Sequence, residues 1–391
     1  MLSTRRPYLI VPKLIEQPTW GGDYIVKYKN WLDKSDLKNI KIGQSYELFD
    51  QSNLLINIYD SSDIRIKPEI IYLSTTYTKN QNKDNTLEKI NLSDLVMSNP
   101  KQILGKKILE KFLKMPILIK FTQALGNSFQ THIKPNVFHH CWRPKAESWY
   151  YFEDGLLSFG IKKGINLQVY QKTCQAIDTR MRQLSSKILS GDMALSDAQD
   201  EAKKFIHQLN PWQFVNIHKV DKNILIDLSM GGLHHSWEDD LKNYPKGNIL
   251  YEIQQDMPDS VSTIRCFDQG KFKEDGNIRE LHIADYFKFI DLDIEHNKME
   301  KAICQRSDNN LLSTKYYTLD ILEISDRIKD NTGNSFCHLF VREGEININT
   351  DGGNVHLSKG HSCFLPKNVG EYEIKSTDPK QSVILKTYIK I

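Results

Sequence analysis

The sequence lacks any apolar run close to the ~20 residues that a membrane-spanning helix needs. An apolar run near the N-terminus ends at Pro12 and Lys13, which is too early for the core of a signal peptide. The chain also has no long block of charge of one sign, because its 52 basic and 49 acidic residues are interspersed. We therefore expect a cytoplasmic protein with no membrane or nucleic-acid partner. These features leave its oligomeric state open.

Cysteine motifs are missing as well, since the chain contains no C-x-x-C pair. Their absence excludes a zinc ribbon and gives no sign of a disulfide framework. The six cysteines lie far apart, at positions 141, 174, 266, 304, 337 and 363. We expect most of them to be reduced, buried thiols.

Short apolar runs separated by turn residues are what the sequence has instead. Near the C-terminus, the stretch CHLFVREGEININTDGGNVHLSKGHSCFLPKNVGEYEIKS is interrupted by glycines at regular intervals. Evenly punctuated strands of this kind are typical of a jelly roll or a barrel. The sequence therefore predicts a mainly β fold.

Helical periodicity is confined to a few segments. Between Leu167 and Leu209, apolar residues recur at alternating spacings of four and three, which predicts an amphipathic helix with one packed face. The stripe consists of Tyr170, Cys174, Ile177, Met181, Leu184 and Ile188. A second helix follows it, with a capping box formed by Ser196 and Gln199. Another helix is expected to begin at Pro100 and to continue until Pro116.

Polar residues that share one face of a predicted strand are the candidates for a functional site. Side chains alternate between the two faces of a strand, so Ser128, Gln130 and His132 in GNSFQTHIKP project to the same side. The same alternation in RPKAESWYYF places Lys145 and Glu147 together. Both strands carry apolar or aromatic neighbours that can form a core.

Two further segments add candidates. In MGGLHHSW, His234 and His235 follow a glycine bend, and in NILYEIQQ, Glu252 shares a strand face with Gln254. One Gln, two His and one Glu form an N/O ligand set that suits Zn²⁺ and can also suit Fe²⁺, Mn²⁺ or Co²⁺. Each residue alone is more often structural than a ligand. Together they indicate a metal site, because burying so many polar groups without a metal or partner would be costly.

These segments, in this order, resemble the type I mannose-6-phosphate isomerases of the cupin superfamily. TWGGDYIVKY and IGQSYEL are similar to the opening W-G-G and I-G-E-S-W-E segments of that family, and PILIKFTQALGNSFQTHIKP is similar to its Q-x-H strand. KAESWYYF resembles its K-x-E-x-W-Y segment, GGLHHSW its G-x-x-H bend, and GNILYEIQQ with STIRCFD its E-x-Q-Q and T-x-R-x-x-D stretch. The resemblance implies cupin (jelly-roll) barrels: a catalytic domain at 1–164 and 211–290, a helical insertion at 165–210 and a C-terminal cupin-like domain at 291–391.

The resemblance also implies roles for individual residues. It implies one divalent metal ion, with Zn²⁺ expected, bound by Gln130, His132, Glu147 and His234. It implies catalytic roles for Arg265, Lys145 and Glu252, and binding of a substrate phosphate by Ser128 and Lys271. Because His235 directly follows His234, the choice of ligand between these two remains open. The proton-transfer base remains open between Lys145 and Glu252.

The expected function is metal-dependent interconversion of mannose 6-phosphate and fructose 6-phosphate through an enediol, so the expected partner is a small-molecule sugar phosphate. Ile133 and Lys134 replace an acidic continuation in the family, which leaves isomerisation of another phosphosugar as an alternative. A non-catalytic sugar-phosphate-binding cupin is a second alternative. An Fe(II) oxygenase is a third, since two His and one carboxylate can form an open iron site.

Residues 256–262 contain extra residues relative to the family. His139 and His140 are expected in a loop and outside the site, because adjacent residues cannot share a strand face.

Overall fold

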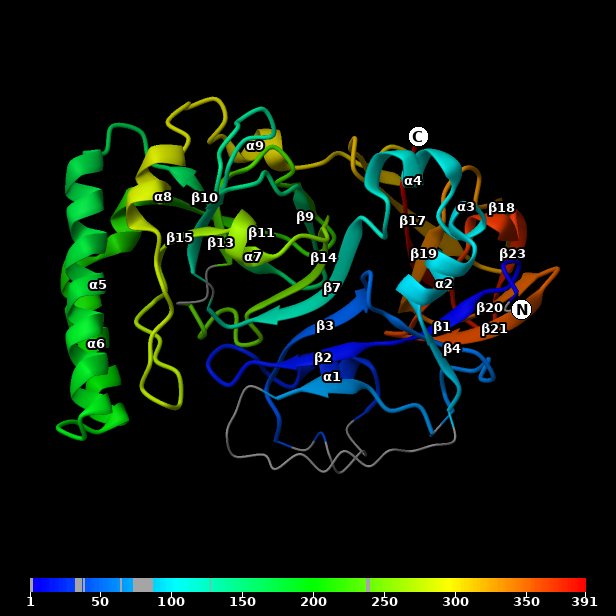
Figure 1. Ribbon diagram of the computed structural model, residues 1–391, viewed down its shortest axis with the longest axis horizontal. Coiled ribbons are helices and arrows are strands. Elements are labelled where there is room, and N and C mark those ends of the chain that lie inside the picture. The colour runs from blue at the N-terminus through cyan, green and yellow to red at the C-terminus, as the bar shows by residue number, and fades with distance from the viewer. Residues whose placement is uncertain are drawn as a thin grey trace.

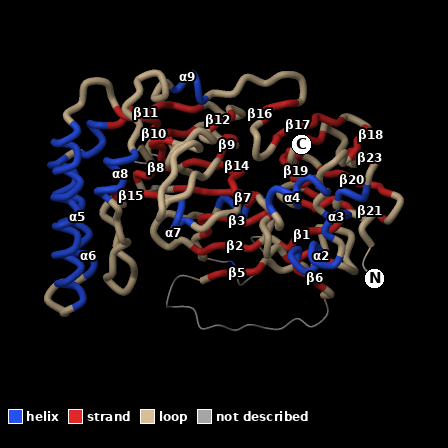
Figure 2. The backbone as a smooth tube through the Cα atoms, turned by 45° about the horizontal axis from the view of Figure 1, so that its top comes forward, coloured by secondary structure: helices blue, strands red, loops and turns tan. Residues whose placement is uncertain are grey.

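The computed structural model describes residues 3–31, 37, 39–63, 65–72, 87–126, 128–236 and 240–391. Strands occupy the middle and one end of the molecule, and two long helices, α5 (Leu167–Leu189) and α6 (Leu195–Leu209), lie side by side at the other end (Figures 1 and 2). The predicted mainly β architecture is therefore confirmed. Among the described residues, no helix is both long enough and apolar enough to cross a membrane.

Two sheets in the middle of the molecule carry the candidate site. The seven-stranded sheet has the order β12 (Leu225–Asp227), β9 (Glu147–Tyr151), β14 (Asn248–Gln255), β7 (Ile117–Ala124), β3 (Ile42–Leu48), β2 (Lys13–Glu16) and β5 (Glu69–Ile71). The five-stranded sheet has the order β11 (Val215–Val220), β10 (Gly155–Ile161), β13 (Gly232–Ser236), β8 (Phe129–His132) and β15 (Ile264–Phe267). Side chains from β9 meet side chains from β8 and β13, so one face of each sheet looks toward the other.

Two more sheets form the C-terminal end. The eight-stranded sheet has the order β16 (Asn310–Ser313), β17 (Thr318–Ile324), β24 (Ser382–Tyr388), β19 (Cys337–Glu343), β22 (Ser362–Leu365), β1 (Tyr8–Val11), β4 (Asn53–Leu55) and β6 (Lys89–Asn91). The four-stranded sheet has the order β18 (Arg327–Asn331), β23 (Glu371–Ser376), β20 (Glu345–Thr350) and β21 (Gly353–Ser358). β1 pairs with β22, so the N-terminal strand completes a C-terminal sheet, and both chain ends lie at this end of the molecule (Figure 1). The predicted domain boundaries stay predictions.

The helices pack as their patterns require. The side chain of Asn166 caps α5 by accepting hydrogen bonds from the backbone N–H groups of Gln168 and Val169. The predicted stripe of α5 is buried from Tyr170 to Leu184, and it packs against β15 and α8 (Ile283–Phe289). The shorter helices are α1 (Tyr24–Tyr28), α2 (Leu92–Ser98), α3 (Pro100–Ile103), α4 (Lys106–Phe112), α7 (Asp259–Ser262) and α9 (Met299–Ala302), with 3₁₀ turns η2 (Pro211–Phe214) and η3 (Lys367–Val369).

Two local expectations were wrong in detail. The helix expected from Pro100 to Pro116 is broken at Gly105, where φ is +101° and an added Cβ would collide with the backbone carbonyl of Asn334. α6 begins at Leu195 with Ala194 as its N-cap, so Ser196 lies inside the first turn and makes no cap hydrogen bond. The expectation that most cysteines are reduced, buried thiols is confirmed, because all six are free and four are buried.

A buried ion pair joins the middle sheets to the C-terminal sheets. Lys29, at the end of α1, lies 2.8 Å from Glu47 on β3, and both side chains are almost completely excluded from solvent. The Lys29 ammonium also donates to the carbonyl of Gly360, and the Glu47 carboxylate accepts from Ser362. Burial lowers the pKa of Lys29, which the nearby Glu47 carboxylate opposes. Charges this deep are tolerated only because each has its partner and further hydrogen bonds.

We expect Lys29→Met to lower the free energy of unfolding by about 3–5 kcal/mol, because it leaves the Glu47 charge buried without its partner. The matched control is Lys27→Met on the same helix, where the pair with Asp23 is solvent-exposed and should contribute less than about 1 kcal/mol. Urea denaturation of both variants measures the difference. Equal losses would contradict the structural role of the buried pair.

Candidate metal centre

The four predicted metal ligands come together between the two middle sheets. β8 and β13 pair antiparallel with Gln130 opposite His234, and Glu147 reaches them from β9 in the facing sheet. His132 Nε2 lies 3.2 Å from Glu147 Oε2, and His234 Nε2 lies 2.9 Å from Glu147 Oε1. The Gln130 amide lies 3.3 Å from His234 Nε2. Donor atoms of His132, Glu147 and His234 all lie within 4.8 Å of one another, and the three residues are buried.

The backbone fixes the tautomers of both imidazoles. His132 Nδ1 donates to the carbonyl of Ser262 at 2.6 Å, and His234 Nδ1 donates to the carbonyl of Gly232 at 3.1 Å. A carbonyl oxygen only accepts, so in the neutral imidazole the proton sits on Nδ1 and Nε2 carries a lone pair. Burial, followed by the charge of Lys145, lowers the pKa of His132 to about 4, which keeps this ring neutral at pH 7.

Glu147 supplies the negative charge of the cluster. Burial acts to raise the pKa of Glu147, but Lys145 and the two histidines outweigh it and hold that pKa well below its usual range. The carboxylate oxygens and the imidazole lone pairs therefore converge as acceptors on one buried point. A divalent cation satisfies such a set of acceptors. Rotation of the Gln130 amide would add its oxygen to the set. Zn²⁺ suits the resulting ligands, which are one carboxylate, two imidazoles and one amide oxygen. The residues present thus fit the implied metal.

The choice between His234 and His235 follows from strand geometry. These neighbours point to opposite faces of β13. The ring of His235 lies 2.5 Å from the hydroxyl of Ser158 through Nδ1 and 3.2 Å from the amide of Gln269 through Nε2. His235 is therefore engaged on the far side of the sheet, and only His234 faces Glu147.

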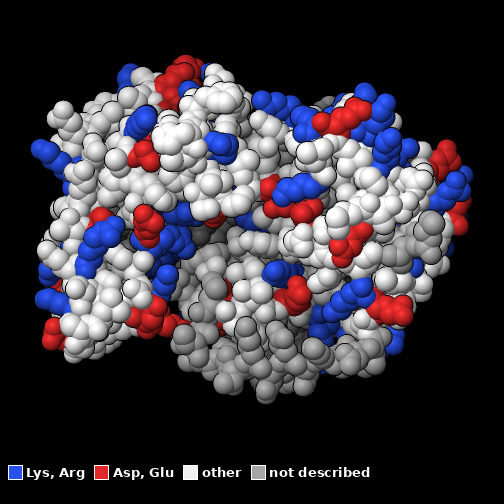
Figure 3. Space-filling model, in the orientation of Figure 1, with Lys and Arg blue, Asp and Glu red and all other residues white. Residues whose placement is uncertain are grey.

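A polar cleft of about 670 Å³ opens in front of the cluster. Its lining includes the predicted residues Ser128, Gln130, Lys145, Glu147, Glu252, Arg265 and Lys271. His132 and His234 are not in this lining, so the cluster is reached from the cleft through Gln130 and Glu147. Figure 3 shows a hollow near the middle of this face, with Lys and Arg atoms gathered beside it.

The three predicted catalytic residues occupy different positions in the cleft. Lys145 Nζ lies 2.9 Å from Glu147 Oε2, directly beside the cluster. Glu252 accepts from Lys120 Nζ at 3.0 Å. Arg265 pairs with Asp259 at 2.9 Å, and its Nε is buried without a hydrogen-bond partner among the described residues. A buried orphan donor beside a cleft is a position from which a ligand can be bound.

Lys271 and Ser128 lie at another part of the same lining. The Lys271 ammonium donates to the carbonyl of Gly126 in the segment that leads into β8. Ser128 is buried two residues before Gln130. The structure therefore brings both predicted phosphate-binding residues to the cleft.

Sequence reasoning missed four charged residues of the lining: Lys120, Asp259, Asp268 and Arg279. Lys120 interrupts the apolar strand ILIKF, and a lysine in a buried strand is a signal that could have been used. Asp259 lies on α7, inside the segment 256–262 that contains extra residues, and bridges Arg265 and Lys145. Arg279 lies in a charged loop, and no local sequence pattern there indicates that it lines the cleft.

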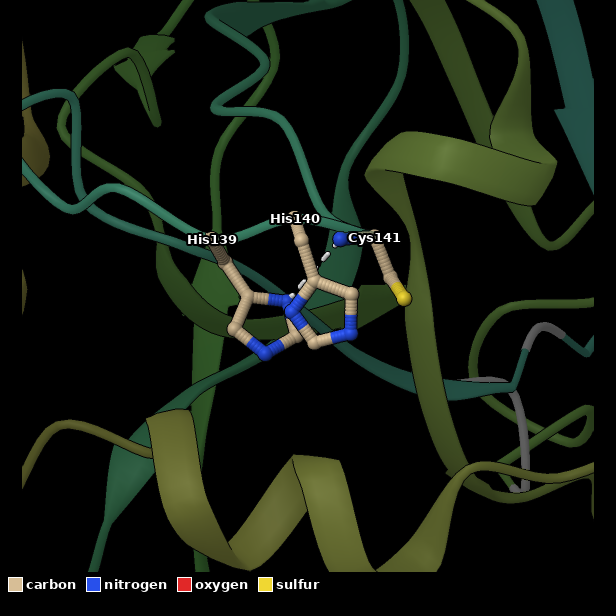
Figure 4. A group of neighbouring side chains, drawn as sticks. All are labelled: His139, His140 and Cys141. Atoms are coloured by element: carbon tan, nitrogen blue, oxygen red, sulfur yellow. Dashed lines mark hydrogen bonds between the residues drawn. The ribbon is translucent and has the colours of Figure 1, made fainter.

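A second group of metal-ligating types lies on the loop between β8 and β9. His139, His140 and Cys141 place possible donor atoms within 4.8 Å of one another near the surface (Figure 4). His139 Nδ1, however, accepts from the backbone N–H groups of Cys141 and Trp142. These hydrogen bonds at Nδ1 organise a turn. The proton of the neutral ring therefore sits on Nε2, so neither nitrogen of His139 has a lone pair left for a metal.

Comparisons with known proteins agree with the fold described above. Residues 307–379 match the family model "Mannose-6-phosphate isomerase, cupin domain". The mannose 6-phosphate isomerase of Bacillus subtilis is 15% identical with a TM-score of 0.61, over 97% of this chain and 99% of that one. The enzyme of Salmonella typhimurium, solved with fructose 6-phosphate and zinc, is 12% identical with a TM-score of 0.61, over 98% of this chain and 100% of that one. A search of curated protein sequences found no match.

The likeness to the solved structures extends over nearly the full length of both chains, and the family model matches within the C-terminal sheets. The resemblance predicted from the sequence is therefore confirmed at the level of the fold: the chain shares the fold of the solved mannose-6-phosphate isomerases, and its residues 307–379 match the model of that family's cupin domain.

Proposed function

We propose that this protein is a metal-dependent isomerase that interconverts mannose 6-phosphate and fructose 6-phosphate in the cytoplasm. The observation that carries the proposal is the convergence of the Glu147 carboxylate with the Nε2 atoms of His132 and His234 at the inner end of a cation-lined cleft. A shared fold supports it, since a solved relative holds fructose 6-phosphate and zinc.

Gln130, His132, Glu147 and His234 would hold one divalent ion, with Zn²⁺ as the first candidate. When bound, such an ion supplies a Lewis acid for negative charge that develops on sugar oxygens. The backbone carbonyls of Ser262 and Gly232 keep both imidazoles oriented for this role.

The isomerisation moves a proton between neighbouring carbons through an enediol, so the chain needs an acceptor and a donor near the cluster. In Glu252, carboxylate oxygens held by Lys120 at 3.0 Å and Thr122 at 3.3 Å line the cleft and can accept a proton. Lys145 is an ammonium bonded to Glu147 and has no lone pair in that state. We therefore assign acceptance to Glu252 and hydrogen-bond donation to Lys145.

Arg265 is placed to stabilise the charge of the enediolate. Its guanidinium already has one nitrogen paired with Asp259, while the buried Nε makes no hydrogen bond within the described part of the chain. Fixed donors aimed at developing charge cost no reorganisation during reaction.

The phosphate would lie away from the metal along the same strand face. Ser128 precedes Gln130 by two residues, which separates them by roughly 7 Å along an extended chain. Lys271 provides the positive charge at that part of the cleft. A six-carbon sugar can then place its phosphate at one end and its carbonyl near the cluster.

The decisive experiment is a coupled assay of fructose 6-phosphate formation with protein loaded with zinc, manganese or cobalt. We expect turnover of mannose 6-phosphate. Absence of turnover with all three metals would reject the proposal. Turnover confined to a different phosphosugar would favour the alternative substrate.

The neighbouring histidines offer a matched test of the metal centre. We expect His234→Ala to lose bound zinc and activity, because it removes an imidazole that faces Glu147. His235→Ala should keep zinc at one ion per chain, since that ring contacts Ser158 and Gln269 instead. Metal analysis of both variants decides the point, and zinc loss in the His235 variant with retention in the His234 variant would reverse the assignment.

Lys271→Ala should raise KM for mannose 6-phosphate by on the order of ten- to a hundred-fold, because it removes a charge-assisted hydrogen bond to phosphate. Metal content should not change, since the ammonium is not a ligand. Lys273→Ala, an exposed lysine two residues later, is the control. Steady-state kinetics of both variants test this, and an unchanged KM in the Lys271 variant would remove it from the substrate site.

A further inference from the structure

The loop between β15 and α8 brings an arginine into the cleft that no sequence motif indicated. Arg279 lines the cleft together with Ser128, Arg265 and Lys271. Arg279 and Lys271 also line a smaller hollow next to α5. The two cations lie at opposite ends of one loop segment, yet both face the same space.

Contacts with α5 hold this loop in position. Lys273 N–H donates to the carbonyl of Asn277 at 2.8 Å, and Gly276 N–H donates to the carbonyl of Lys273 at 2.9 Å, which closes a tight turn. Ser185 on α5 donates its hydroxyl to the carbonyl of Gly276 at 2.8 Å. Gly276 has φ of +81°, and a Cβ there would press against Ile188. The helix therefore fixes the turn from Lys273 to Asn277, two residues before Arg279.

The guanidinium of Arg279 is only loosely engaged. Within the part of the chain that the structure describes, its ion-pair partner is Asp268, with Nε and Oδ2 3.6 Å apart, longer than a hydrogen bond. The side chain is 44% exposed, against 14% for Asp268. An arginine has five N–H donors in a planar fork, so most of its donors remain for a ligand.

Like charges also gather here. Arg265, Lys271 and Arg279 line one cleft, and the pKa of Arg265 is lowered first by burial and also by the charge of Arg279. Cations that face a shared cleft repel one another until an anion lies between them.

We propose that Arg279 binds the substrate phosphate jointly with Lys271 and makes the cleft selective for a dianionic phosphomonoester. This inference rests on the proposed function as far as the sugar phosphate is concerned. A phosphate dianion offers oxygens for a bidentate pair with the arginine fork and a further oxygen for the lysine ammonium. Asp268 approaches the guanidinium only at Nε, so the two terminal nitrogens remain for the phosphate. A neutral sugar would gain nothing from either cation.

The test compares Arg279→Ala with Arg279→Lys in zinc-loaded protein. For Arg279→Ala we expect KM for mannose 6-phosphate and the dissociation constant of inorganic phosphate, measured by calorimetric titration, to rise together by on the order of ten- to a hundred-fold. Arg279→Lys should recover part of the loss, because it keeps the charge and loses the fork. Zinc content and melting temperature should not change.

A pH profile separates phosphate binding from a structural role. Phosphate monoesters lose their second proton near pH ~6, so wild-type affinity should fall as pH drops below that value. The fall should be shallower in Arg279→Ala, because the preference for the dianion is reduced. Arg182→Ala on α5 is the control, since this exposed arginine pairs with Asp178 and does not line the cleft.

The outcomes separate this inference from the proposed function. If wild-type protein turns over mannose 6-phosphate and Arg279→Ala has the same KM and the same phosphate affinity, the inference is overturned and the proposed function stands. If wild-type protein shows no turnover, the titration with inorganic phosphate still decides. Binding that weakens in Arg279→Ala supports the phosphate site, and no binding to wild-type protein, or binding unchanged in the variant, overturns it.

Discussion

The convergence of acceptor atoms around Glu147 is the constraint on which the rest of the structure depends. A buried carboxylate is costly unless charges and hydrogen bonds compensate it. Here Lys145 compensates it from two residues before the strand, and the imidazoles of His132 and His234 face it from the opposite sheet. The arrangement requires Gln130 to lie opposite His234. A slip of one residue in any of these strands would turn its polar side chains away from the cleft.

The same constraint extends to the rim of the cleft. The backbone carbonyl that orients His132 belongs to Ser262, the last residue of α7. α7 begins with Asp259, whose carboxylate reaches Arg265 at 2.9 Å and Lys145 at 3.5 Å. One helical turn thus fixes a metal-facing imidazole at its end and two cleft cations at its start. The segment 256–262 therefore contacts residues of the candidate site directly.

How much could be predicted from the sequence depends on how local each feature is. Strand alternation was sufficient to group Ser128, Gln130 and His132, because the two-residue period is a property of the strand itself. It could not choose between His234 and His235, since that depends on which face of β13 meets β9. The break at Gly105 depends on Asn334, more than two hundred residues away in the chain.

Distance along the chain also explains the missed residues. Lys120 meets Glu252 only because β7 and β14 pair in a specific register. Arg279 reaches the cleft only because α5, from a remote segment, holds its loop. A lysine in an apolar strand marks Lys120 as unusual but does not identify its partner, and Arg279 has no local pattern that indicates the cleft. Strand alternation grouped residues within one element and the family resemblance grouped candidates from separate strands, whereas contacts outside those motifs were not predicted.

The charge balance of the cleft favours binding of the proposed metal and the proposed phosphate together. Five basic and four acidic side chains line the described part of the cleft, so its formal charge is one positive. Glu252 is paired with Lys120 and Asp259 with Arg265, so these carboxylates do not repel an incoming anion strongly. A divalent ion at Glu147 would raise the formal charge to three positive. A phosphate dianion at Lys271 and Arg279 would return it to one. Each charged ligand therefore lowers the electrostatic cost of binding the other, which favours an occupied site with both present over a site with either one alone.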